Sequence, residues 1–290
     1  MKIFSLRDAS NKDTLGVLLP SDSFRYIDLC ATESSIPVSL LELITIDPNF
    51  ALVAKAMQLS NPVTGQMADI TFRTLIERPG KIVCMGLNYA DHAKEGGNAR
   101  PDYPSFFMRG PNSLTAHEAP IIRPTVSDKL DYEAELAFIV GTRAHQLNQS
   151  NALSCIAGYS IFNDGSIRDY QRKTTQWTIG KNFDQTGAFG PWLVTPDELP
   201  QGASGLRIQS RLNGIVMQDA NTTDFLWGVA ETLVLITECM TLEPGDVVIT
   251  GTPAGVGYAK TPPVFMKPGD ICEVEIEGIG ILRNPIQDAT

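Results

Sequence analysis

The sequence predicts a β-rich α+β fold with a small N-terminal α+β domain ahead of a larger second domain. Short apolar stretches separated by Gly and Pro dominate the chain after residue 80. Only one clear amphipathic helix, at 225–240, is evident in that part. Many short strands at this spacing favour a roll or sandwich over a doubly wound α/β sheet.

The predicted N-terminal domain covers residues 1–72. No residue pattern in this part indicates chemistry, so we interpret it as a structural or dimer-supporting unit. Its apolar patterns indicate strands at 2–6, 14–19 and 25–29, followed by helices at 39–46 and 51–59.

The predicted second domain covers residues 73–290 and opens with a linker-like stretch, 76–80. A short apolar strand at 81–86 follows. Further strands are expected at 135–140, 156–163, 206–212, 246–250 and 270–276.

Composition excludes several classes of protein. The net charge of the 290 residues is −10 and no basic run occurs, so we expect no nucleic-acid partner. No window approaches 18 uncharged apolar residues, and the N-terminus lacks a signal-peptide stretch, so we expect a soluble chain with no membrane partner. Five widely spaced cysteines without a CxxC pair indicate reduced thiols and a cytoplasmic location.

Three carboxylates form the first candidate site. Glu133 and Glu135 alternate along a predicted strand and therefore share a face. Taken alone, such a pair is usually a solvated strand end. Asp164 ends the next apolar strand, where a turn residue before Gly165 is the other interpretation. Three carboxylates without His or Cys suit a hard cation, Mg²⁺ or Mn²⁺.

Further segments follow these carboxylates in order: 178–184 (TIGKNFD), 212–214 (LNG) and 242–257 (LEPGDVVITGTPAGVG). Together with Glu133-Ala134-Glu135 and Phe162-Asn163-Asp164, their order and spacing resemble the fumarylacetoacetate hydrolase family across about residues 80–285. The resemblance implies a catalytic domain over 73–290, folded as a mixed β-sandwich roll, and a homodimer. It also implies Glu133, Glu135 and Asp164 as metal ligands, and Lys181 beside them as a catalytic residue that balances developing negative charge.

His92 and Glu95 form the second candidate site. On a helical turn they are i, i+3 neighbours, and a carboxylate beside an imidazole raises its basicity. A solvated helix face is the other interpretation, but the resemblance favours a general base on a lid over 88–103. Gly96 and Gly97 suit its hinge.

Four further residues are expected to bind substrate. Arg168 and Gln171 follow Asp164 at i+4 and i+7, on one helical face, and Thr252 resembles the family's grip on a 2-oxo acid carboxylate. Arg109 stands where family members often carry Lys, so we expect it to hold a carboxylate in two-point fashion. His117 and His145 lie in loop-like surroundings and are assigned no function.

The resemblance implies a Mg²⁺-dependent hydrolase that cleaves the C–C bond of a 2,4-dioxo acid. Such a substrate is an acylpyruvate, for example fumarylpyruvate of aromatic catabolism, and the products are pyruvate and a carboxylic acid. Oxaloacetate decarboxylation and isomerisation of a 2-hydroxy-diene-dioate on the same metal site are the alternatives. A non-catalytic binding module is disfavoured because all the candidate site residues are present.

Overall fold

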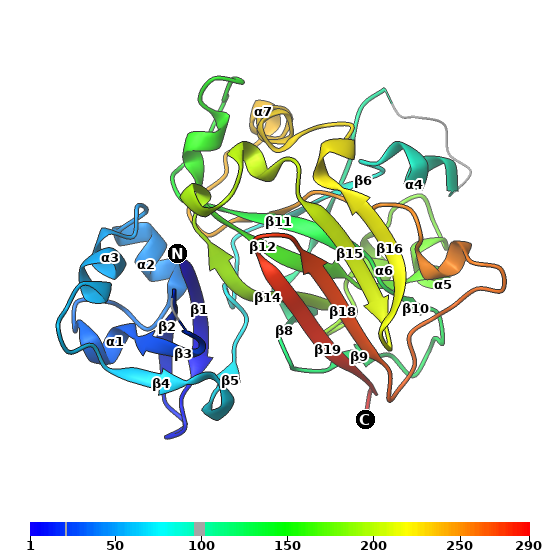
Figure 1. Ribbon diagram of the computed structural model, residues 1–290. Coiled ribbons are helices and arrows are strands. Elements are labelled where there is room, and N and C mark those ends of the chain that lie inside the picture. Colours follow the sequence, from blue (N-terminus) through cyan, green and yellow to red (C-terminus); the bar gives the residue numbers. More distant parts are fainter. Residues whose placement is uncertain (21, 96–101) are drawn as a thin grey trace.

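The computed structural model describes residues 1–20, 22–95 and 102–290, and in these ranges the chain is β-rich with few helices (Figure 1). A twelve-stranded mixed sheet and a five-stranded sheet hold nearly all of its strands. The predicted β-rich α+β class is therefore confirmed.

The N-terminal part combines five strands with three short helices. Two helices begin at the residues that cap them: Asp28 accepts from Ala31 N, and Ser39 accepts from Glu42 N. The elements are β1 (Lys2–Arg7), β2 (Asp13–Leu19), β3 (Asp22–Asp28), α1 (Leu29–Thr32), α2 (Leu40–Ile46), α3 (Ala51–Met57), β4 (Thr64–Gln66) and β5 (Thr71–Phe72).

The remainder of the large sheet comes from the catalytic part. Its order is β4-β3-β2-β1-β14-β12-β11-β17-β6-β7, with β5 beside β1 and β8 beside β14. The added strands are β6 (Ile82–Gly86), β7 (Ser105–Arg109), β8 (Leu114–Ala116), β11 (Ala134–Val140), β12 (Ile156–Asp164), β14 (Gly187–Val194) and β17 (Val247–Ile249).

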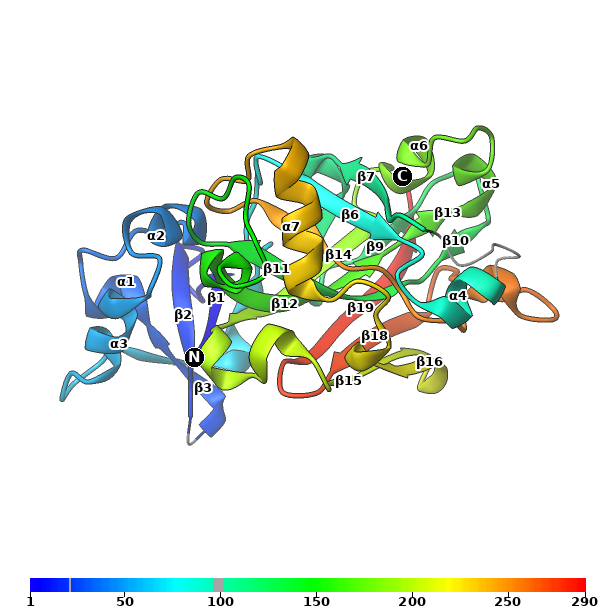
Figure 2. The same cartoon turned by 90° about the horizontal axis from the view of Figure 1, so that it is seen from above.

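The N-terminal sheet continues into the catalytic sheet through β1 and β14. Lys2 lies opposite Val194 and Ile3 opposite Leu193. Figures 1 and 2 show this N-terminal unit at one end of the molecule and α4 (Ala90–Glu95) toward the other. The domain boundary at residue 72 stays a prediction, because the two parts share both a sheet and a core.

A second sheet packs on the first and encloses the main core. Along β11, Leu136 and Phe138 face this core, whereas Ala137 and Ile139 face the core shared with the N-terminal unit. Every residue of β11 is buried, because both of its faces are covered. The second sheet runs β16 (Ile215–Asn221), β15 (Arg207–Leu212), β18 (Ile271–Ile276), β19 (Gly280–Asp288) and β9 (Ile121–Arg123).

The helix expected at 225–240 is α7 (Val229–Cys239), which starts at the N-cap Gly228 and buries Leu233 and Ile236 against the main core. No helix in the described part of the chain is long and apolar enough to cross a membrane. The expected homodimer and cytoplasmic location stay predictions.

His117 lies at the junction between the two cores. Its ring meets that of Phe72 edge-on at 4.6 Å, and its Nδ1 accepts a hydrogen bond from Arg283 N at 3.0 Å. Burial, with a smaller effect from Arg283, lowers the pKa of His117 to about 4.

We expect His117 to make stability fall as the pH falls from about 6.5 to 4. In this window the unfolded chain binds a proton that the folded chain excludes, which removes up to about 3 kcal/mol of the free energy of unfolding. His117→Asn keeps an acceptor for Arg283 N and should flatten this dependence in urea titrations across pH. The control is the same substitution at the exposed His145. An unchanged slope in His117→Asn would contradict this account.

Candidate active site

Glu133, Glu135 and Asp164 converge where β11 begins and β12 ends. The two strands are antiparallel, with Ala134 opposite Asn163, and Asp164 N donates to Glu133 O at 2.9 Å. The start of one strand therefore lies beside the end of the other. Each of the three residues offers one ligand atom, and these atoms lie within 4.8 Å of one another.

Three buried cations hold this cluster together. Lys181, from α6 (Thr178–Lys181), places Nζ 2.5 Å from both Glu133 Oε2 and Asp164 Oδ2. Arg168 Nη1 lies 2.7 Å from Glu133 Oε1, and Arg109 Nη1 lies 2.5 Å from Asp164 Oδ1. Burial opposes ionisation of Glu133, but Arg168 and Lys181 outweigh it and lower its pKa to about 2. Burial likewise opposes the charge of Lys181, but Asp164 and Glu133 raise its pKa.

Glu135 differs from its neighbours in having no cation within ion-pair distance among the described residues. Its Oε2 accepts from Gly251 N at 2.5 Å. Burial, then the charges of Asp164 and Glu133, raise the pKa of Glu135 well above its usual range. A hard divalent cation would supply the missing positive charge, and the all-oxygen donor set suits such an ion. The residues present therefore fit a metal site.

Arg109 does not reach the cavity, so the expected grip on a substrate carboxylate is wrong. Its side chain is fully buried, and it also donates from Nε to Ser113 Oγ at 3.1 Å and from Nη2 to Thr186 Oγ1 at 2.9 Å. The close approach of Gly187, where a Cβ would lie 2.6 Å from Nη2, gives this guanidinium its space. Arg109 therefore holds the Asp164 carboxylate by an ion pair without lining the cavity.

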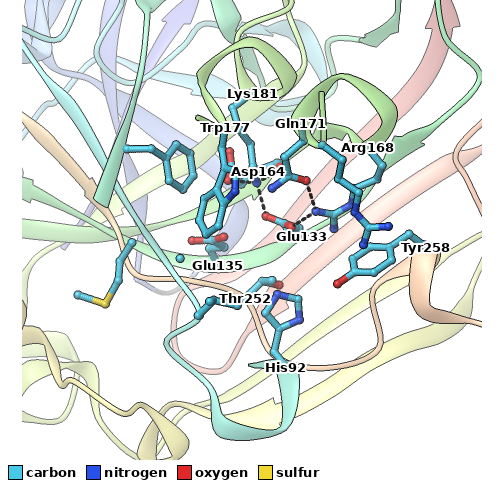
Figure 3. A pocket seen from close by; sticks show the side chains of 15 residues that line it. His92, Glu133, Glu135, Asp164, Arg168, Gln171, Trp177, Lys181, Thr252 and Tyr258 are labelled. Atoms are coloured by element: carbon cyan, nitrogen blue, oxygen red, sulfur yellow. Dashed lines mark hydrogen bonds and ion pairs between the residues drawn. The ribbon is translucent and has the colours of Figure 1, made fainter. Parts of the chain in front are cut away.

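A cavity of about 450 Å³ opens over the carboxylates. Figure 3 shows Glu135 and Trp177 on one side, Arg168 and Tyr258 on the other, and His92 with Thr252 below the centre. Five residues predicted from the sequence line it in addition to the three carboxylates: His92, Arg168, Gln171, Lys181 and Thr252.

The lid helix α4 brings His92 to the cavity. His92 Nδ1 lies 3.7 Å from Glu95 Oε2, beyond hydrogen-bond length, and this buried nitrogen has no hydrogen-bond partner in the described part of the chain. Both Glu95 oxygens accept from Gly255 N at 3.0 Å. Burial raises the pKa of Glu95, but His92 and the Gly255 N–H together lower it. The expected hinge residues Gly96 and Gly97 lie outside the described residues.

The loop that receives Glu95 requires glycine at residue 255. Gly255 has φ +103°, and a Cβ there would lie 2.3 Å from Met217 O. A side chain at this position would disturb the loop that carries the N–H bound by Glu95.

The sequence predicts a helix that starts at Asp164, and this predicted start is wrong. Strand β13 (Ser166–Ile167) pairs with β10 (Leu130–Asp131), and α5 (Arg168–Gln171) begins only after it. Arg168 and Gln171 nevertheless both line the cavity, joined by an Nη1–Oε1 hydrogen bond of 2.9 Å.

Asp131 and Gln218 position residues that line the cavity. Both are buried, and neither was predicted from the sequence. Asp131 accepts from Arg168 Nε at 2.8 Å and from Tyr258 N at 3.0 Å. Gln218 Nε2 donates to Thr252 Oγ1 at 2.7 Å, which leaves the Thr252 hydroxyl proton free to point into the cavity. Asp131 could have been suspected from its place two residues before Glu133, but no local signal marks Gln218.

Comparisons of the sequence and of the structure with known proteins point to the same family. The family described as Fumarylacetoacetate (FAA) hydrolase C-terminal matches residues 81–287. The mitochondrial oxaloacetate tautomerase FAHD2A of Bos taurus is 36% identical over 263 residues, which cover 90% of this chain and 83% of that protein. The solved fumarylacetoacetate hydrolase of Exiguobacterium antarcticum is 34% identical, with a TM-score of 0.84 over 100% of both chains. A probable 2-hydroxyhepta-2,4-diene-1,7-dioate isomerase from Mycobacterium abscessus is 27% identical, with a TM-score of 0.81 over 100% of both chains.

We expect Glu135→Gln and Asp164→Asn to affect stability in opposite directions while both weaken Mg²⁺ binding. Glu135 is costly to ionise in the metal-free protein, so its removal should raise Tm in EDTA, by about 2–4 °C for each kcal/mol gained. Asp164→Asn leaves Arg109 without a charged partner and Lys181 with Glu133 alone, a loss of about 3–5 kcal/mol.

Calorimetric titration with MgCl₂ and thermal unfolding in EDTA measure these two effects. The Asp169→Asn variant, at an exposed position on α5, is the matched control. Wild-type Mg²⁺ affinity in both site variants would rule out the metal site.

Proposed function

Since the chain belongs to the fumarylacetoacetate hydrolase family, we propose that it is a metal-dependent enzyme that interconverts the keto and enol forms of a small 2-oxo diacid such as oxaloacetate. The observation that carries this proposal is the carboxylate cluster under a polar cavity, with the unpartnered His92 imidazole nitrogen beside it. The 36%-identical relative named an oxaloacetate tautomerase supports the choice of this reaction ahead of hydrolysis.

The chain's own residues supply binding and orientation. A Mg²⁺ ion held by Glu133, Glu135 and Asp164 would act as a Lewis acid toward the 1-carboxylate and the 2-oxo oxygen. The Thr252 hydroxyl, oriented by Gln218, donates to the 1-carboxylate.

The reaction itself is a proton transfer at C3. The His92 imidazole takes the C3 proton, the electron pair of that bond forms the C2=C3 double bond, and the 2-oxo oxygen gains the negative charge. The Lys181 ammonium, kept charged by its carboxylate partners, stabilises this oxygen until the proton taken by His92 is returned to it, directly or through a water molecule. This completes the enol and restores the neutral imidazole. The lid helix carrying His92 limits the entry of further water.

Hydrolysis of an acylpyruvate is the second candidate, favoured by Glu95 beside His92. In this reaction the imidazole activates water, which attacks the 4-oxo carbon. The C3–C4 bond then breaks, its electrons form pyruvate enolate, and a carboxylic acid leaves. The 34%-identical solved structure bears the name of a fumarylacetoacetate hydrolase, an enzyme that hydrolyses a different dioxo acid.

The purified protein should accelerate the decay of the enol absorbance of oxaloacetate in the presence of Mg²⁺. EDTA should abolish the acceleration, and Mg²⁺ or Mn²⁺ should restore it, because the carboxylate cluster lacks one compensating cation. Pyruvate release, coupled to lactate dehydrogenase, separates the alternatives. Release from an acylpyruvate without tautomerisation would identify a hydrolase, and release from oxaloacetate would identify a decarboxylase.

His92→Ala should lower the rate of either reaction by about 10²–10⁴-fold, the usual contribution of a general base. Glu95→Ala should lower it less, because His92 keeps some basicity alone. Glu95→Gln retains the acceptor for Gly255 N but removes the charge that faces His92. Equal losses in Glu95→Gln and Glu95→Ala would show that the charge matters more than the contact with Gly255. Full activity in His92→Ala would remove the proposed base.

A further inference from the structure

Two arginines flank one tyrosine ring beside the cavity. The Arg168 and Arg172 guanidinium carbons lie 4.6 Å and 4.2 Å from the centroid of the Tyr258 ring. Asp131 accepts from Tyr258 N, which fixes the turn that carries the ring, η7 (Gly257–Ala259). Arg172 and Tyr258 both line the cavity, although neither was predicted from the sequence.

Part of this cationic pair lacks a partner. Arg168 is 5% exposed, yet its Nη2 is buried without a hydrogen-bond partner in the described ranges, whereas Nε and Nη1 are bound to Asp131, Gln171 and Glu133. A buried guanidinium N–H without an acceptor is costly, so an oxygen of a bound molecule is expected there. Arg172 is exposed and makes no ion pair with any residue that the structure describes.

We propose that Arg172, together with Nη2 of Arg168, binds the distal carboxylate of the substrate and thereby selects 2-oxo diacids. This inference rests on the proposed function, which places the 2-oxo acid end over the carboxylate cluster. Figure 3 shows Arg168 and Tyr258 across the cavity from Glu135 and Trp177, so a substrate extended in this direction brings its far end to the arginines.

The Tyr258 ring orders the Arg172 side chain for binding a carboxylate. Stacking on Tyr258 holds the planar guanidinium in place, so less side-chain freedom is lost when a carboxylate binds. A guanidinium also donates to both oxygens of a carboxylate, which a lysine cannot do with the same geometry. The opposite wall, with Met85, Phe107 and Trp177, offers apolar surface and would suit an uncharged tail instead.

A pair of stable ligands tests this selection without turnover. 2-Oxoglutarate and 2-oxopentanoate have the same chain length and differ in the distal carboxylate. In calorimetric titrations with Mg²⁺ present, the wild type should prefer 2-oxoglutarate. Arg172→Gln should weaken 2-oxoglutarate binding by about tenfold and leave 2-oxopentanoate unchanged, as expected for a charge-assisted contact near the surface. Arg172→Lys should retain part of the preference.

Lys173→Gln is the matched control, because it removes an exposed neighbouring charge that lies 3.5 Å over the Tyr170 ring rather than at the cavity. A Lys173→Gln effect equal to that of Arg172→Gln would reduce the role of Arg172 to general surface charge and overturn the inference. An unaltered preference in Arg172→Gln, or equal losses for both ligands, would also overturn it.

An activity measurement distinguishes this inference from the proposed function. Oxaloacetate and its 4-ethyl ester undergo the same tautomerisation, but only the first carries the distal charge. Arg172→Gln should raise KM for oxaloacetate about tenfold, with little change in kcat or in the values for the ester. A wild type that accelerates neither reaction but prefers 2-oxoglutarate would reject the proposed reaction and retain the carboxylate site.

Discussion

The contact between Lys181 Nζ and the carboxylates of Glu133 and Asp164 is the interaction on which the site depends. Without Lys181, the two buried carboxylates would repel each other, and burial would favour their neutral, protonated forms. The ammonium, with Arg168 and Arg109 behind it, allows both to stay ionised. Glu135 has no such cation within ion-pair distance among the described residues, and a metal ion bound to the cluster would compensate its charge.

Local periodicity predicted the carboxylate set because strand alternation fixes which side chains share a face. Glu133 and Glu135 are two residues apart, and Asp164 ends the neighbouring strand, so short-range rules brought them together, while the family resemblance indicated them as ligands. Arg109 could not be assigned in the same way. Its direction depends on the packing of β7 against Gly187, a contact between residues far apart in the sequence. Gln218 was missed for the same reason, since its partner Thr252 is 34 residues away.

Many of the strands were also predictable, but β14, β16 and β19 were not among those expected, and the arrangement of the strands could not be predicted. The pairing of β1 with β14 joins Ile3 to Leu193, and no local pattern in either segment specifies its partner. This strand arrangement affects the site, because it packs β11 between the N-terminal core and the main core. The strand that begins at the site is therefore held rigidly on both faces, which suits preorganised ligands.

The loop from Thr252 to Tyr258 contacts several parts of the site at once. Thr252 faces the expected 2-oxo acid end, Gly255 N binds Glu95 of the lid helix, and Tyr258 supports the two arginines. A molecule bound at both ends of the cavity therefore rests on the same short segment that holds the lid. Its departure requires this segment and the lid to loosen together, so residence time, and not affinity alone, should distinguish a long ligand from a short one.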